Sequence, residues 1–212
     1  ALRPLFGENW RLEELTVNYR TPAQITREAE RFAREHGLPV TPTRAVREGD
    51  WPIRIVQVAR GRAEGAGEGV GEGVGEGGAE GAAEGVADTL LGAIVEAVRV
   101  ERELDSSGTL AVIAPVALVD EVLAVLVGAF DGGSGGPFGG ASGGASGPMV
   151  GRGAVGLGRP IAVLTAREAK GLEFDAVVLA DPDAIVAESP RGASALYVAM
   201  TRPTQRLTLV RP

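Results

Sequence analysis

The sequence predicts an α/β fold built on a parallel sheet that is flanked by helices. Its 212 residues suffice for one such domain with a substantial core, and 44% of them are hydrophobic. Short apolar runs rich in valine, isoleucine and leucine alternate with segments of helical pattern, as is typical of strands buried on both faces by helices. The predicted strands are 53–59, 109–114, 161–165, 176–180 and 207–210.

The first predicted helix has the clearest local signals. Thr21 can cap its start, Pro22 suits its first turn, and Gln24 would complete a capping box. Gly37 then ends it. Backbone N–H groups at the start of this helix would favour a phosphate beside residues 18–20. The predicted helices are 22–35, 88–103, 116–127 and 194–202.

Two glycine-rich segments interrupt the alternation of strands and helices. In 61–85 a glutamate recurs every four residues, but the many glycines make a helix costly, so we predict a solvated Gly/Glu insertion. A passive spacer is a simpler interpretation of it than an acidic interaction segment. The segment 131–158 is rich in glycine and serine and is predicted to be a mobile loop. We therefore expect a single domain over 1–212 with two disordered loops.

Composition excludes several kinds of chemistry. The chain has no cysteine, which excludes disulfides, thiolate metal sites and a cysteine nucleophile. His36 is the only histidine, so a histidine-based triad or a multi-histidine metal site is excluded too, and we expect no metal site in this chain. His36 precedes Gly37 at a predicted helix end, where it would complement the helix dipole. No apolar run has the length of a membrane span, so we expect a soluble, cytoplasmic protein without a membrane partner.

The formal net charge of -7 is unevenly distributed. Without the regularly spaced glutamates of the first glycine-rich segment the chain is nearly neutral, so its acidity does not exclude a nucleic-acid partner. The chain opens at Ala1 on a sequence that reads like an interior piece, and we expect a fragment of a longer protein. The six glutamates are Glu64, Glu68, Glu72, Glu76, Glu80 and Glu84.

Lys170 is the only lysine among 21 basic residues. It follows an apolar strand and precedes Gly171, which would let a ligand approach the backbone, so a phosphate contact is one interpretation and a solvated turn is the other. A P-loop needs Gly-Lys followed by serine or threonine, whereas Lys170 is followed by Gly171 and Leu172. This chain therefore contains no P-loop.

Three segments, taken in order along the chain, resemble the C-terminal motifs of the UvrD/Rep branch of superfamily 1 helicases. The resemblance implies the second RecA-like domain, of P-loop NTPase-like fold, in a two-domain ATP-driven motor. The segments are Asn18-Tyr19-Arg20-Thr21-Pro22, Ala169-Lys170-Gly171-Leu172-Glu173-Phe174-Asp175 and Tyr197-Val198-Ala199-Met200-Thr201-Arg202.

The resemblance implies catalytic roles for Arg20 and Arg202. In this family the arginines at the matching positions contact the γ-phosphate, and Arg202 resembles an arginine finger, which stabilises charge on the transferred group. The alternatives are an ion pair at a helix N-terminus for Arg20 and an ordinary helix-end charge for Arg202. Pro203 stands where alanine is common in the family, so we expect Arg202 at a helix end.

The resemblance implies nucleotide contacts for four more residues. Tyr19 would stack on the adenine ring, although packing against the following helix is the alternative. Glu173 would accept hydrogen bonds from the ribose, and Lys170 and Gly171 would form a loop that transmits the nucleotide state. Arg167 stands where many members of the family have histidine.

We therefore expect the C-terminal motor half of an ATP-dependent DNA helicase or translocase. It would complete the ATP site of a missing N-terminal RecA-like domain, which would also hold the Mg²⁺ ligands, and it would not hydrolyse ATP alone. The lack of a large inserted domain resembles actinobacterial HelD-like ATPases, so an RNA polymerase-binding factor that remodels or recycles polymerase is one alternative. A catalytically silent, truncated domain is the other.

Overall fold

The computed structural model describes residues 16–58, 89–132 and 147–212. These residues form a six-stranded sheet in the order β3-β8-β7-β4-β6-β5, and every neighbouring pair of strands in it is parallel. The predicted fold class is therefore confirmed. The strands are β3 (Arg54–Gln57), β4 (Leu110–Ile113), β5 (Val150–Arg152), β6 (Ile161–Leu164), β7 (Phe174–Ala180) and β8 (Pro203–Arg211).

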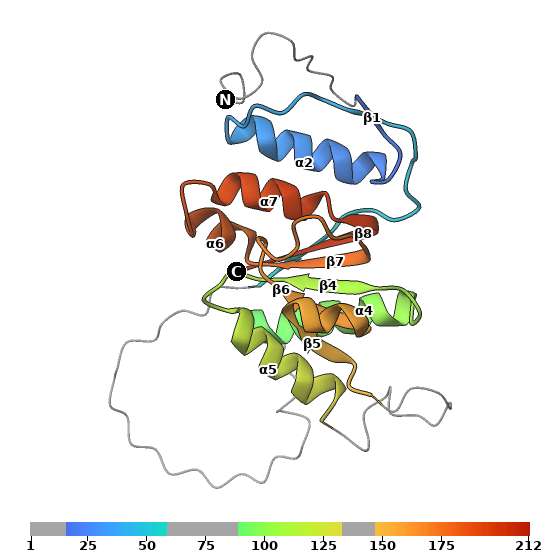
Figure 1. The fold of residues 1–212 in the computed structure, drawn as a ribbon, viewed down its shortest axis with the longest axis vertical. Coiled ribbons are helices and arrows are strands. Elements are labelled where there is room, and N and C mark those ends of the chain that lie inside the picture. Colours follow the sequence, from blue (N-terminus) through green and yellow to red (C-terminus); the bar gives the residue numbers. More distant parts are fainter. Residues whose placement is uncertain (1–15, 59–88, 133–146) are drawn as a thin grey trace, which may run out of the picture.

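Helices cover both faces of this sheet, and one helix forms an additional outer layer. Residues of α4 and α5 share one core cluster with one face of the sheet, and residues of α6 and α7 share a second cluster with the other face; in Figure 1, α2 lies above α7. A short parallel pair, β1 (Val17–Asn18) and β2 (Arg44–Ala45), lies beside α2. The helices are α2 (Ala23–Glu35), α4 (Leu90–Leu104), α5 (Val119–Phe130), α6 (Pro182–Ala187) and α7 (Gly192–Met200).

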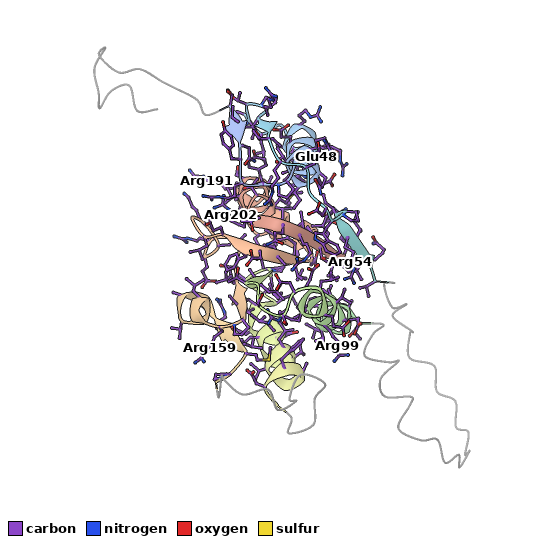
Figure 2. The ribbon with its side chains drawn as sticks, turned by 90° about the vertical axis from the view of Figure 1, so that its right-hand side faces the viewer. Glu48, Arg54, Arg99, Arg159, Arg191 and Arg202 are labelled. Carbon is purple, nitrogen blue, oxygen red and sulfur yellow. The ribbon has the colours of Figure 1, made fainter. Side chains whose placement is uncertain are left out.

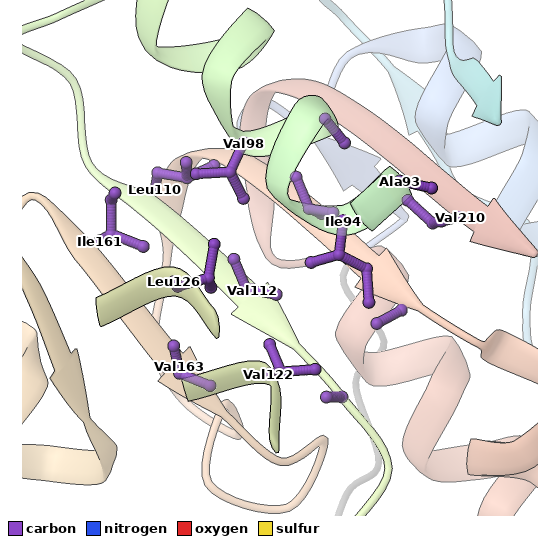
Figure 3. Close-up of a cluster of buried hydrophobic side chains, with 14 of the residues drawn as sticks. Ala93, Ile94, Val98, Leu110, Val112, Val122, Leu126, Ile161, Val163 and Val210 are labelled. Atoms are coloured by element: carbon purple, nitrogen blue, oxygen red, sulfur yellow. The ribbon is translucent and has the colours of Figure 1, made fainter. Parts of the chain in front are cut away.

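Strand β4 explains why the predicted strands are continuously apolar. Leu110 and Val112 face α4 and α5, as Figure 3 shows, whereas Ala111 and Ile113 face the opposite side with α6 and α7. Because successive side chains alternate between two covered faces, all four residues are buried. The core thus has two halves, one on each side of the sheet.

The start of α2 differs from the prediction. Its N-cap residue is Pro22, which makes no side-chain capping bond, so the predicted capping box is wrong. Gln24 instead holds the later loop: its Nε2 donates to the Trp51 carbonyl at 2.8 Å, and its Oε1 accepts from the Gly49 N–H at 3.0 Å. The end of α2 is as predicted, with His36 as the C-cap residue.

The described part of the second glycine-rich segment contains regular structure, which corrects the prediction of a loop over the whole of 131–158. It contains β5 and the 3-10 helix η1 (Gly153–Gly158). A Cβ on Gly156 would lie 2.4 Å from the carbonyl oxygen of Gly151, so glycine is needed here for close backbone packing. The predicted Gly/Glu insertion at 61–85 lies outside the described residues.

The bounds of several elements differ from the prediction. Helix α5 begins at Val119 rather than at residue 116, and β8 extends back to Pro203. The short elements β1, β2, β5 and α6 were not predicted. In the part of the chain that the structure describes, no helix is long and apolar enough to cross a membrane.

A buried ion pair joins α4 to β8. Glu101 and Arg206 have side chains only 3% and 6% exposed, and the Arg206 Nε donates to a Glu101 oxygen at 2.8 Å. The Thr208 hydroxyl donates to the other Glu101 oxygen at 2.7 Å. The guanidinium of Arg206 also lies over the Trp51 ring, 5.9 Å from its centroid. This network connects the sheet, a helix and the loop that follows β2.

Candidate functional site

The connection from β6 to β7 crosses the sheet from one end to the other. Both strands run parallel to β4, so the chain must travel from the carboxyl end of β6 to the amino end of β7. Residues 165–173, which we call the crossing segment, form this connection. Lys170 lies within it, followed by Gly171 at φ +85°, a conformation that favours glycine. One short segment therefore reaches both ends of the sheet.

At the carboxyl ends of β4 and β6 lies a cavity of about 990 Å³, which we call the carboxyl-end cavity. Its lining includes three cationic side chains, Arg167, Lys170 and Arg191, and the first residues of α7. The positive end of a helix dipole adds to their charge. Glu188 is the carboxylate of the lining, and it accepts a hydrogen bond from the Val116 N–H. This cavity is chemically suited to an anion.

A second cavity, of about 630 Å³, lies near the amino ends of β7 and β8, and we call it the amino-end cavity. Tyr19, Arg20, Tyr197 and Arg202 line it, and the Tyr19 side chain is largely exposed to solvent at 73%. Glu173 stands at its border, where its carboxylate pairs with the Arg20 guanidinium at 2.8 Å. Four of the predicted site residues thus meet here.

Asn18 shapes the chain beside the amino-end cavity. Its Oδ1 accepts hydrogen bonds from the backbone N–H groups of Arg20 and Thr21, at 3.0 and 3.1 Å. Its Nδ2 lies 3.3 Å from the Thr26 hydroxyl on α2. An asparagine side chain that bonds the following backbone in this way forms a tight local turn. This turn places Tyr19 and Arg20 before the helix.

Arg202 is held firmly by uncharged acceptors. Its Nε donates to the Val198 carbonyl at 2.9 Å, its Nη1 to the Leu172 carbonyl at 3.1 Å, and its Nη2 to the Thr201 hydroxyl at 3.2 Å. Burial lowers the pKa of Arg202, and the nearby Arg20 guanidinium lowers it further. An arginine nevertheless stays protonated. Because these acceptors are neutral, they do not neutralise the positive charge of Arg202, which is available to an anion in the amino-end cavity.

The structure places each of the predicted site residues. Arg202 lies just beyond the end of α7 and directly before β8, as expected. Tyr19, the aromatic candidate, is 73% exposed. Lys170 does not share a cavity with Arg202: it lines the carboxyl-end cavity, whereas Gly171 and Glu173 line a separate pocket near the start of β7. The crossing segment is what connects these places.

Arg191 is a site residue that the sequence prediction missed. It is the N-cap residue of α7, where a positive charge is unfavourable to the helix dipole, and this mismatch was the available signal. Figure 2 shows Arg191 on the same side of the molecule as Arg202, whereas Arg54 and Arg99 lie on the opposite side. One labelled cation of each cavity, Arg191 and Arg202, thus lies on the same side of the molecule in this view.

The fold and one partial family match are both compatible with the predicted class of domain. A six-stranded parallel sheet with helices on both faces is the fold class predicted for a RecA-like domain. Residues 160–210, which run from β6 into β8, match the UvrD-like helicase C-terminal domain family. This match includes Lys170, Glu173 and Arg202. Tyr19 and Arg20 lie outside it, before its first residue.

Comparison with individual proteins gives less information than the family match. A similar solved structure is the C-terminal domain of a possible DNA helicase from Lactobacillus plantarum WCFS1, with 21% sequence identity and a TM-score of 0.47. The similarity covers 92% of this chain and 87% of that one. No curated protein matches the chain.

Two carboxyl groups near the site make stability depend on pH. Burial of Glu168 opposes its ionisation, but hydrogen bonds from Thr165 and Arg152 outweigh burial and hold the pKa of this carboxyl below its ordinary value of 4.5. Hydrogen bonds from Thr109, its backbone N–H foremost, likewise lower the pKa of Asp175. Groups with a lowered pKa stabilise the folded state above their unfolded-state pKa and lose that contribution as the pH falls.

We therefore expect the free energy of unfolding to be constant near neutral pH and to decrease below about pH 4.5. Urea unfolding of the chain from about pH 7 to about pH 3 measures this. The double variant Glu168→Gln and Asp175→Asn should show a shallower decrease, because neither amide titrates. An equally steep decrease in the double variant would contradict the assignment to these two carboxyls.

Proposed function

We propose that this chain is the C-terminal motor half of an ATP-dependent DNA helicase or translocase. It completes the ATP site of a P-loop domain that lies outside this sequence. The observation that carries this proposal is the crossing segment: it joins the amino-end cavity, where Arg202 offers a positive charge, to a cationic cavity at the other end of the sheet. A motor requires this kind of connection between two ligand sites.

On the nucleotide side, Arg202 and Arg20 contact the γ-phosphate of ATP, and Tyr19 stacks on the adenine. Glu173 accepts hydrogen bonds from the ribose hydroxyls. Arg20 and Glu173 pair with each other in this structure, but both side chains are more than half exposed, at 57% and 55%. An exposed pair of this kind costs little to open. ATP would therefore exchange it for a phosphate contact and a ribose contact.

Magnesium accompanies ATP in such a site and neutralises charge on the phosphates. Its ligands belong to the P-loop domain. The role of this chain is confined to the side of the nucleotide that faces away from the P-loop, where a cation from a second domain stabilises the transferred group. The chain alone is therefore inactive.

On the nucleic-acid side, the carboxyl-end cavity binds the phosphates of a DNA strand. Arg167, Lys170 and Arg191 supply the charge, and the start of α7 adds backbone N–H groups. Lys170 and Gly171 then act as the link: a shift at one end of the crossing segment is carried to the other, because Leu172 within it accepts a hydrogen bond from Arg202. ATP state and strand binding are coupled through this contact.

The experiment joins the chain to the P-loop domain encoded upstream of it and measures ATP hydrolysis with and without single-stranded DNA. We expect DNA to stimulate hydrolysis and Lys170→Ala to remove most of that stimulation. For the chain alone, we expect salt-dependent binding of a fluorescent oligo(dT), and Lys170→Ala should reduce the salt slope by about 0.7, the value for one lost phosphate contact on a single strand.

Glu96→Gln is the matched surface control, because it lies on α4 and pairs with the exposed Arg99. It should leave both measurements unchanged. If the upstream sequence encodes no P-loop, the chain is a silent domain and the motor proposal fails. If DNA still stimulates ATP hydrolysis fully in Lys170→Ala, the carboxyl-end cavity is not the DNA site and that part of the proposal is wrong.

A polymerase-binding ATPase is a second candidate, because the chain places only β3, α4, β4 and α5 between β2 and β5 within the described residues, without a large inserted domain. Such a factor would use the same ATP site to change conformation rather than to separate strands. Strand separation by the joined protein, measured against its binding to RNA polymerase, distinguishes the two. Stable polymerase binding without unwinding would replace the helicase by this candidate.

A further inference from the structure

The crossing segment begins with a turn that is closed by reciprocal hydrogen bonds. The Thr165 N–H donates to Glu168 Oε2 at 2.7 Å, and the Glu168 N–H donates to the Thr165 hydroxyl at 3.3 Å. The Thr165 hydroxyl in turn donates to Glu168 Oε2 at 2.9 Å. This is the geometry of a capping box, here at the start of a turn rather than of a long helix.

A second element holds the same carboxylate. Arg152 on the edge strand β5 donates through Nη1 to Glu168 Oε2 at 2.7 Å, and its side chain is only 30% exposed. The next residue, Gly153, has φ +58°, and a Cβ there would lie 3.5 Å from the other Glu168 oxygen. One carboxylate oxygen thus receives three hydrogen bonds, two from its own turn and one from a neighbouring strand.

The residues that this turn carries are those of the carboxyl-end cavity. Arg167 and Lys170 line the cavity, whereas Glu168 lies between them in sequence and is not part of the lining. A carboxylate so close to a site for phosphate repels the ligand, so its presence there calls for a separate structural role. Its ion pair with Arg152 compensates the negative charge, and its hydrogen bonds fix the backbone from which both cations project.

We propose that Glu168 is a positioning residue: clamped by Thr165 and Arg152, it fixes the turn that presents Arg167 and Lys170 to the phosphates of a nucleic-acid strand. This inference rests on the proposed function of the carboxyl-end cavity. It also gives β5 a function, because the strand holds the turn through Arg152. The ordered part of the glycine-rich segment then serves the binding site.

The substitution Glu168→Gln separates positioning from electrostatics by the sign of its effect. Removing a negative charge beside a phosphate site should by itself tighten the binding of DNA. An uncharged amide oxygen accepts hydrogen bonds more weakly than a carboxylate, so loss of positioning should weaken binding. We expect Glu168→Gln to bind fluorescent oligo(dT) roughly three- to tenfold more weakly, the effect of one hydrogen bond. Its salt slope should fall by about 0.7 if one phosphate contact is lost.

Glu96→Gln is again the control, because it makes the same change of charge away from the cavity, on α4, and should not weaken binding. Arg152→Met should weaken binding too, and the double variant Glu168→Gln with Arg152→Met should be no weaker than the weaker single variant. Such non-additivity is expected of residues that act as a unit. Additive losses would contradict the clamp.

Backbone hydrogen exchange over residues 161–175 provides a measurement that does not depend on DNA. We expect faster exchange in Glu168→Gln than in the wild-type chain or in Glu96→Gln. A lower melting temperature with unchanged oligo(dT) affinity and salt slope would mean that Glu168 only stabilises the fold, and it would overturn the proposal.

Two failures can be told apart. If the wild-type chain does not bind oligo(dT), or if Lys170→Ala binds it equally well, the carboxyl-end cavity is not a nucleic-acid site and both proposals fall. If Lys170→Ala weakens binding but Glu168→Gln leaves it unchanged or tightens it, only the positioning role is overturned.

Discussion

Replacing Arg202 with alanine should reduce the ATP turnover of the joined two-domain protein by about three orders of magnitude or more, the range found for arginine fingers. Its guanidinium is fixed by Val198, Leu172 and Thr201, so it is already oriented before a nucleotide arrives. A preorganised cation of this kind stabilises charge in the transition state without further rearrangement. Steady-state ATP hydrolysis, with kcat and KM determined separately, measures the effect.

Arg202→Lys tests whether charge alone suffices. A lysine keeps the positive charge but cannot form the same planar fork with three acceptors, so we expect it to recover little of the lost turnover. Arg99→Ala, on α4 at the opposite side of the molecule, is the matched control and should turn over normally. Because Arg202 also contacts Leu172, the melting temperature of each variant must be compared. Unchanged turnover in a folded Arg202→Ala protein would refute the finger assignment.

Replacing Glu101 with alanine should lower the free energy of unfolding by about 3–5 kcal/mol, the usual cost of leaving one partner of a buried ion pair alone. The change leaves the Arg206 guanidinium, which is only 6% exposed, with the more distant Asp105 carboxylate at 3.9 Å, and it removes the acceptor of the Thr208 hydroxyl. Urea unfolding of the chain at neutral pH measures it.

Glu103→Ala is the control for this prediction, because Glu103 is exposed on the same helix and the substitution removes the same type of side chain. It should alter the free energy of unfolding by less than about 0.5 kcal/mol. If Glu101→Ala costs no more than this control, the buried pair contributes nothing to stability and the prediction is wrong.

Most of the sheet could be predicted because its strands are covered on both faces. Runs such as Leu110–Ile113 and Ile161–Leu164 are apolar at every position, and turns or helices separate them clearly. The strand β5 was missed because its glycines were interpreted as a sign of mobility. In the fold, Gly151 and Gly156 allow two backbones to touch, which is an equally physical reason for glycine.

The same kind of ambiguity affected the capping signals. Thr21 with Gln24 and Thr165 with Glu168 both have the spacing of a capping box, but only the second pair forms one. Gln24 makes its hydrogen bonds to a loop that is distant in sequence, at Trp51 and Gly49, which no local pattern shows. Tertiary contacts decided which of the two local signals was used.

The candidate site divides in a similar way. Three of the residues in the ordered motifs, Tyr19, Arg20 and Arg202, line one cavity in the fold, and Glu173 pairs with Arg20 beside it, but their roles stay a prediction. The motifs did not predict that Lys170 lies in a different cavity from this group, or that Arg191 lies in the same cavity as Lys170. Both facts depend on the order of the strands in the sheet, which sequence periodicity does not determine.

The position of β8 affects the order in which the molecule can assemble. Although β8 is the last strand in this sequence, it lies inside the sheet, where it pairs with β7 over residues 203–210 and with β3 over residues 208–211. The early strand β3 therefore has no partner until residues 208–211 have been synthesised. Pairing across such a sequence separation is slow, since the loop entropy must be lost first. The helix α2, which follows Tyr19 and Arg20, packs against α7, so during synthesis on the ribosome it cannot dock before residues 192–200 have been made.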